Sequence, residues 1–151
     1  MTDRSIVHAM FTVERSWKHA PERVFAAWAN PAHKRQWFGS PEEGNADHIF
    51  DFREGGREYS ASDMGGDRYT YDVSYRDIVA NNRIVYTYEM TKNGERMSVS
   101  LATIELFAVG GGTRMVVRED GAFLDGLDTV DQREAGTNYL VDQLGAFLDR
   151  T

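Results

Sequence analysis

The sequence predicts an α+β protein in which an antiparallel sheet packs against one long C-terminal helix. Two observations support this prediction. Between residues 129 and 151, apolar side chains recur every three or four positions, which is the spacing of one helix face. Between residues 47 and 122, short strand-like segments alternate with turn signals. We expect the helix to bury its apolar face against the sheet, because neither element is stable with that face exposed.

The C-terminal helix has clear start signals. Thr129 is followed three residues later by Gln132, which is a capping-box pattern. Asp128 and Asp131 place negative charge at the end where the helix dipole favours it. The apolar face consists of Val130, Thr137, Leu140, Val141, Leu144, Phe147 and Leu148.

The first part of the chain is predicted to form a strand and then two helices. Residues 6–17 alternate in the manner of a half-buried strand. Pro21 suits the first turn of a helix. The Asn-Pro pair at 30–31 ends this helix and begins a second, because the residue before a proline avoids helical geometry. We expect the second helix to carry Trp37 and Phe38.

Five turn signals divide the middle of the chain into six predicted strands. Each signal contains glycine or asparagine, and Asn93-Gly94 is a typical hairpin pair. Strands joined by such short turns are antiparallel neighbours. The predicted strands are residues 47–53, 57–63, 68–79, 83–92, 95–108 and 113–122.

Large aromatic side chains share faces of these strands. They can simply form the core. Alternatively, a strongly curved sheet cannot collapse fully onto one helix, so they line an amphipathic cavity in which a ligand or water satisfies the tyrosine hydroxyls. The side chains in phase are Phe50 and Phe52, then Tyr69, Tyr71, Val73 and Tyr75, then Tyr86, Tyr88 and Met90.

Two stretches depart from simple alternation. In strand 95–108, Val99 and Leu101 are out of phase with the apolar residues that follow. Either a bulge changes the phase of this strand, or its outer face is apolar and contacts a second copy in a homodimer. Residues 121–128 are too apolar for a solvated loop, so we expect Phe123 and Leu124 to lie against the protein, over an opening.

Composition limits the function classes. The 151 residues are expected to form one domain, and the absence of cysteine excludes disulfides and thiol chemistry. A net charge of −7 with scattered basic residues argues against nucleic acid or an anionic membrane as the partner. No signal-peptide pattern and no membrane-spanning apolar run is present, so we expect a cytoplasmic protein without membrane insertion.

Local catalytic and cofactor motifs are missing. The histidines lack metal-site spacing and the glycines at 110–112 read as a turn, so no metal or other cofactor is expected. His48 is in phase with Phe50 and is either a cavity acid–base or an exposed strand-end residue. Glu119 is in phase with inward-facing Val117. It is either a general base with a raised pKa or a strand-end carboxylate that pairs with an arginine or caps the next segment.

Several stretches, in this order, resemble the START-like (SRPBCC, birch-allergen-like) helix-grip superfamily. Within it the chain is similar to the family named after the heat-shock ATPase activator. The resemblance covers nearly the whole chain. It is carried by residues 21–31, 37–39, 51–58, 75–88 and 112–113 and by the final helix.

This resemblance implies a β-α-α-β6-α helix-grip fold. A seven-stranded sheet would wrap around the C-terminal helix, and the two short helices would close one end. It also implies a ligand cavity between sheet and helix. The predicted ligand-binding residues are Trp37, Phe50, Tyr71, Tyr86, Tyr88, Met90, Phe123, Thr137, Leu140, Val141 and Leu144.

One pair departs from the pattern of many members. Where these carry Gly-Trp in the final helix, this chain has Gly136-Thr137. The chain resembles a branch with Gly-Thr at this position. A threonine in place of an indole leaves space and adds a hydroxyl, which favours a larger or more polar cavity.

Three functions are compatible with the resemblance. We favour binding of a small hydrophobic or amphipathic molecule, because no catalytic motif accompanies the aromatic faces. The alternative is an enzyme of the polyketide cyclase, aromatase or hydrolase type that uses Glu119, His48 or a tyrosine. The third is an interaction protein that modulates a chaperone ATPase. Fold alone does not decide among them.

Overall fold

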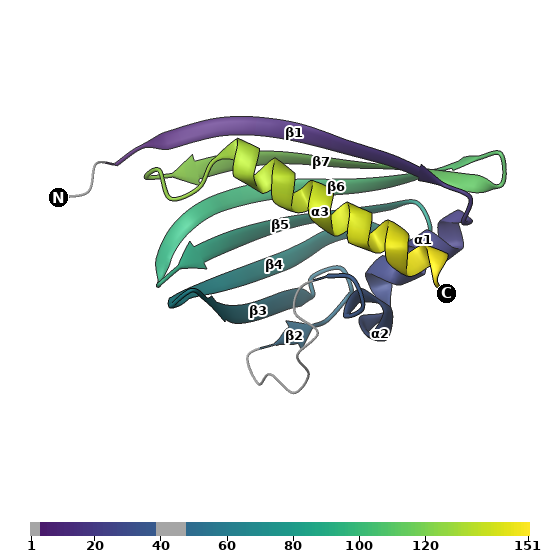
Figure 1. Ribbon diagram of the computed structural model, residues 1–151, viewed down its shortest axis with the longest axis horizontal. Helices are drawn as coiled ribbons and strands as arrows, with labels where there is room; N and C mark the ends of the chain where they lie inside the picture. Colours follow the sequence, from purple (N-terminus) through teal and green to yellow (C-terminus); the bar gives the residue numbers. More distant parts are fainter. Residues whose placement is uncertain (1–3, 39–47) are drawn as a thin grey trace.

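Seven antiparallel strands form one curved sheet, and a long helix lies across its inner face (Figure 1). The computed structural model describes residues 4–38 and 48–151. The strand order β1-β7-β6-β5-β4-β3-β2 is a meander closed by the N-terminal strand, and it confirms the predicted helix-grip fold. The strands are β1 (Ile6–Trp17), β2 (Ile49–Phe50), β3 (Arg57–Met64), β4 (Asp67–Val79), β5 (Arg83–Lys92), β6 (Glu95–Val109) and β7 (Gly112–Leu124).

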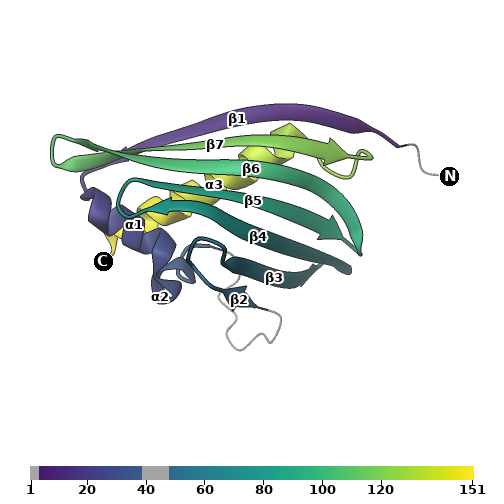
Figure 2. The same cartoon turned by 180° about the vertical axis from the view of Figure 1, so that it is seen from behind.

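The three helices of the described residues lie on the inner side of the sheet. Helices α1 (Pro21–Ala29) and α2 (Pro31–Lys34) sit at one end, beside the C-terminal end of α3 (Val130–Asp149) (Figure 1). Figure 2 shows the opposite face of the sheet, with α3 behind it. The sequence-derived start of α3 is confirmed, because the Thr129 side chain accepts a hydrogen bond from the Gln132 backbone N–H.

Helix α2 is shorter than predicted. Asn30 caps its first turn by accepting from the backbone N–H groups of Ala32 and His33, but the helix ends at Lys34. Trp37 and Phe38 follow in a turn, and their N–H groups donate to the Lys34 carbonyl. The helical pattern in the sequence therefore continues through residues that in fact form a tight turn.

Strand β2 is also shorter than predicted. The strand expected over residues 47–53 begins outside the described residues at 47, and regular pairing ends at Phe50. Beyond it, the chain turns back on itself, because the Arg53 N–H donates to the Asp51 carbonyl and Gly55 has a φ of 81°. Gly56 completes the turn, and a Cβ there would lie 2.1 Å from the Asp51 carbonyl oxygen.

A bulge at Met97 accounts for the phase of β6. Met90 pairs with Ser98 while Thr91 pairs with Arg96, which leaves Met97 as the extra residue. Beyond the bulge, Ser98, Ser100, Ala102, Ile104 and Leu106 face inward and are buried. Val99 and Leu101 face outward and are 42% and 41% exposed. The strand therefore has both the bulge of the first alternative and the apolar outer residues of the second, and the homodimer stays a prediction.

Strand β7 continues further than predicted. It pairs with β1 as far as Leu124, opposite Ile6, so half of the expected connection at 121–128 is strand. Phe123 faces inward and is buried.

The core lies between α3 and the sheet. Val141, Leu144, Phe147 and Leu148 are buried on the predicted helix face. At Gly145 the helix comes close to β1, since a Cβ there would lie 2.9 Å from the Trp17 indole nitrogen. Within the described residues, no helix is long and apolar enough to cross a membrane.

Candidate functional site

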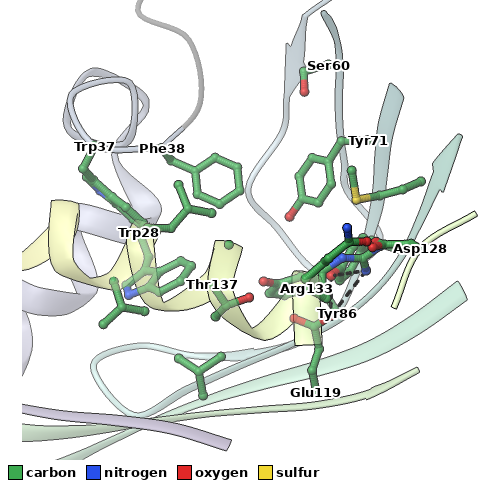
Figure 3. Close-up of a pocket in the computed structure, with 17 residues that line it drawn as sticks. Trp28, Trp37, Phe38, Ser60, Tyr71, Tyr86, Glu119, Asp128, Arg133 and Thr137 are labelled. Carbon is green, nitrogen blue, oxygen red and sulfur yellow. Dashed lines mark hydrogen bonds and ion pairs between the residues drawn. The ribbon is translucent and has the colours of Figure 1, made fainter. Parts of the chain in front are cut away.

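A cavity of about 340 Å³ lies between α3, the middle strands of the sheet and the α1–α2 end (Figure 3). This volume is within the range of small-molecule sites. Aromatic side chains form one side, and a charged cluster forms the other. The predicted ligand-binding residues that line it are Trp37, Tyr71, Tyr86, Tyr88, Met90, Thr137, Leu140 and Val141.

Three predicted residues do not line the cavity, and of these Leu144 and Phe123 are buried while Phe50 is partly buried. Leu144 is in the core one turn further along α3. Phe123 lies beneath Arg133, whose guanidinium carbon is 5.3 Å from its ring centroid. Phe50 packs against Phe52, with ring centroids 6.0 Å apart. Their role in ligand binding stays a prediction.

The aromatic side of the cavity is a chain of rings in contact. Trp28 and Trp37 pack edge to face, with centroids 4.7 Å apart. Phe38 lies between Trp37 and Tyr71, at 5.4 Å and 5.6 Å, and Tyr71 is 5.1 Å from Tyr88. These contacts fix an apolar wall that extends from the helical end of the cavity to its charged cluster.

The charged cluster is centred on Arg133 of α3. Its Nη1 donates to the Tyr88 hydroxyl at 2.9 Å, and its Nη2 donates to Ser98 Oγ at 2.8 Å and Asp128 Oδ2 at 2.7 Å. Tyr88 in turn donates to Glu119 Oε1, which is 3.7 Å from Arg133 Nη1. Arg133 is 8% and Glu119 5% exposed. We call these five residues the arginine cluster.

Burial dominates the ionisation of this cluster. It raises the pKa of the Glu119 carboxyl, although the hydrogen bond from Tyr88 and the charge of Arg133 oppose the rise. Burial also raises the pKa of the Tyr88, Tyr86 and Tyr71 hydroxyls, so these groups stay protonated. For Arg133, burial lowers the pKa, but Tyr88, Asp128 and Glu119 raise it by more, so the guanidinium is charged.

Sequence reasoning missed half of the lining. Arg133 could have been found, because it precedes Thr137 and Val141 at four-residue spacing and thus lies on the apolar face of the helix. An arginine on that face needs buried acceptors. The lining residues that were not predicted for ligand binding are Trp28, Phe38, Ser60, Val117, Glu119, Asp128, Gln132, Arg133 and Gly136.

The two acid–base candidates lie in different environments. Glu119 lines the cavity, is buried and pairs with an arginine inside β7, and its role as a general base stays a prediction. His48 is exposed just before β2 and does not line the cavity. Within residues 4–38 and 48–151, no group of three or more histidine, aspartate or glutamate side chains could hold a metal ion.

Comparisons with known proteins agree with this fold. Residues 18–149 match the sequence model of the family described as activator of Hsp90 ATPase homolog 1-like protein. A crystal structure of the protein Mll3558 from Rhizobium loti is 42% identical, with a TM-score of 0.88 over 95% of this chain and 99% of that one. A protein from Rhizobium leguminosarum is 43% identical, with a TM-score of 0.92 over 99% and 100%. No curated protein matches.

A more distant structure shares the fold alone. CalU16 from Micromonospora echinospora is 17% identical, with a TM-score of 0.68 over 98% of this chain and 86% of that one. At this identity, its function does not transfer to the present chain.

Proposed function

The chain belongs to the activator of Hsp90 ATPase homolog 1-like family, and on this basis we propose that it binds a small amphipathic molecule between α3 and the sheet. One observation supports this most strongly: the cavity has apolar aromatic walls and a buried, hydrogen-bonding cluster at one side (Figure 3). This combination of apolar surface with a few convergent polar groups is characteristic of ligand sites.

The space beside Gly136 and Thr137 supports the same proposal. A Cβ added to Gly136 would meet no heavy atom within 4 Å, so α3 leaves the cavity open at this point. Thr137 faces the space between the aromatic wall and Glu119 (Figure 3). An indole at residue 137 would occupy space that this chain leaves for a ligand.

The proposal is tested with 1-aminoanthracene, a neutral aromatic probe whose fluorescence rises in apolar surroundings. We expect saturable binding to the protein and a loss of affinity of about tenfold or more in Thr137→Trp, because the indole fills the site. Tyr139→Trp is the matched control, since Tyr139 lies on the same helix and is exposed. Equal binding by both variants, or no binding to the unmodified protein, contradicts the proposal.

A second candidate function is acid–base catalysis in the same cavity. The observation that favours it is a buried cavity carboxylate, Glu119, with a raised pKa. The experiment is to incubate the protein with molecules extracted from its native host and to follow conversion by mass spectrometry. A turnover that survives Glu119→Gln unchanged removes this candidate residue.

Modulation of a chaperone ATPase, the activity to which the family description refers, stays a prediction. Its direct test is the ATPase rate of the host chaperone with and without this protein. An unchanged rate argues against this function.

A further inference from the structure

We infer that the ligand of this cavity donates a hydrogen bond to Glu119, as a hydroxyl group does, and carries no negative charge. The inference rests on the proposed function, because it specifies the ligand class of the same cavity. A single buried arginine would ordinarily suggest a carboxylate ligand. The contacts of Arg133 and the charges beside it indicate the opposite.

The guanidinium of Arg133 is already committed to the protein. A carboxylate can form two parallel hydrogen bonds with a guanidinium end-on, through Nη1 and Nη2, or side-on, through Nε and Nη2. Both approaches need Nη2. That nitrogen already donates to Ser98 and Asp128, at 2.8 Å and 2.7 Å. A ligand carboxylate would have to displace one of these buried partners.

The charge of Arg133 is also balanced. It faces Asp128 at 2.7 Å and Glu119 at 3.7 Å, so the cluster is formally −1 when both acids are ionised and neutral when Glu119 is protonated. Arg133 is the one basic side chain among the described residues that line the cavity. An anionic ligand would therefore lose its hydration without meeting a net positive charge.

Glu119, which lines the cavity, keeps one carboxyl oxygen available as a hydrogen-bond acceptor. Glu119 Oε1 accepts from Tyr88, whereas its second oxygen makes no hydrogen bond within the described part of the chain. The Thr137 hydroxyl, which also lines the cavity, likewise has no hydrogen-bond partner among the described residues, whereas the Tyr86 hydroxyl pairs with that of Tyr71. A hydroxyl on the ligand would donate to Glu119 and leave the contacts of Arg133 intact.

The test compares three compounds with the same ring system: 2-naphthalenemethanol, its methyl ether and 2-naphthoate. Each competes with 1-aminoanthracene for the protein at pH 7. We expect the alcohol to displace the probe at a concentration about tenfold or more below that of the naphthoate, and the ether to be weaker than the alcohol because it cannot donate. A naphthoate or an ether as effective as the alcohol overturns the inference, and so does an alcohol that displaces no probe.

A variant sharpens the test. Glu119→Gln removes the ionisable carboxyl and supplies an amide donor, so we expect the naphthoate to gain affinity and its disadvantage against the alcohol to shrink by about tenfold. Glu105→Gln is the control, since Glu105 is exposed on β6, away from the cavity lining. If the alcohol and the naphthoate differ in affinity for Glu119→Gln as much as they do for the unmodified protein, the inference is overturned. Failure of 1-aminoanthracene to bind the unmodified protein is a different result, which contradicts the proposed function itself.

Discussion

Two buried ionic clusters lie on the inner side of the sheet, and they differ in whether protein groups enclose them completely. In the first, Lys34 Nζ is 2.7 Å from Glu58 Oε1, and the Tyr75 hydroxyl donates to the same oxygen at 2.6 Å. Lys34 is 7% and Glu58 2% exposed. The Phe38 and Phe50 rings lie 4.4 Å and 5.1 Å from the ammonium nitrogen. One cation faces one carboxylate.

The arginine cluster also contains a buried cation and carboxylates, but the numbers of positive and negative groups differ. One cation, Arg133, faces two carboxylates, Glu119 and Asp128, and all three line the cavity. Lys34, Glu58 and Tyr75, in contrast, do not line the cavity. The Lys34–Glu58 pair, whose charges match, anchors α2 to β3. The arginine cluster, which has one more carboxylate than cations, leaves a carboxyl oxygen of Glu119 for a ligand.

Breaking the Lys34–Glu58 pair is expected to have the largest effect on the unfolding free energy. Lys34→Ala leaves the Glu58 carboxylate buried without its cation, which costs about 3–5 kcal/mol of unfolding free energy. Urea denaturation measures this loss. Lys92→Ala is the control, because Lys92 lies 3.8 Å from Asp67 in a pair that is about one-third exposed, and a change of about 0.5 kcal/mol or less is expected. A Lys34→Ala variant as stable as the control contradicts the anchoring role.

Breaking the arginine cluster is expected to cost less. In Arg133→Met, Asp128 and Glu119 lose their cation, but both line the cavity and Glu119 can take up a proton. We expect a loss of about 1–3 kcal/mol in the same urea experiment. Arg118→Met, on an exposed pair with Asp120, serves as the surface control. A loss as large as that of Lys34→Ala would remove the distinction between the two clusters.

The pH dependence of stability is expected to be a smaller effect. Because burial raises the pKa of Glu119 above its ordinary value of 4.5, the folded protein holds this proton more tightly than the unfolded chain does. The carboxyl therefore destabilises the fold progressively as pH rises above 4.5, and this penalty is absent at lower pH. Glu119→Gln has no such penalty. As pH rises above 4.5, the unfolding free energy of Glu119→Gln should therefore increase relative to that of the unmodified protein.

Urea midpoints at a series of pH values between about 4 and 7 measure this difference. Glu105→Gln should show no comparable trend, because Glu105 is exposed. A difference between Glu119→Gln and the unmodified protein that stays constant with pH contradicts the assignment.

The smallest expected effect is a stabilisation at the cavity. Gly136→Ala adds a methyl group that meets no heavy atom within 4 Å, and alanine favours a helix over glycine by about 0.5–1 kcal/mol. Gly145→Ala is the matched substitution on the same helix, where the new Cβ would lie 2.9 Å from the Trp17 indole nitrogen. We expect thermal or urea unfolding to show a gain at 136 and a smaller gain, or a loss, at 145. Equal gains would contradict the packing difference.

The sequence predicted the fold in detail because its signals are local. Turn residues such as Asn93-Gly94 and the cap at Thr129 act through their own backbone, so they can be read without the tertiary structure. Strand β2 was predicted too long because the turn at Gly56 packs against the backbone of Asp51, a contact that no alternation pattern records.

The site was predicted in part, and the missing part is its chemistry. Tyr71, Tyr86 and Tyr88 were identified from strand phase, since alternation alone decides which side they face. Arg133 and Asp128 were missed because a charged residue gains its role from partners on other elements. Ser98 and Tyr88, which accept from Arg133, lie 35 and 45 residues away in the chain. Such partners become visible only when the sheet and α3 are assembled.

The placement of the tryptophans gives the protein an internal optical reporter. Two of its three indoles, Trp28 and Trp37, line the cavity, whereas Trp17 packs against Gly145. A molecule that enters the cavity should therefore alter the intrinsic emission of the unlabelled protein. In Trp17→Phe all remaining indole fluorescence comes from the cavity wall, so fractions of a crude extract can be screened for a ligand by emission alone.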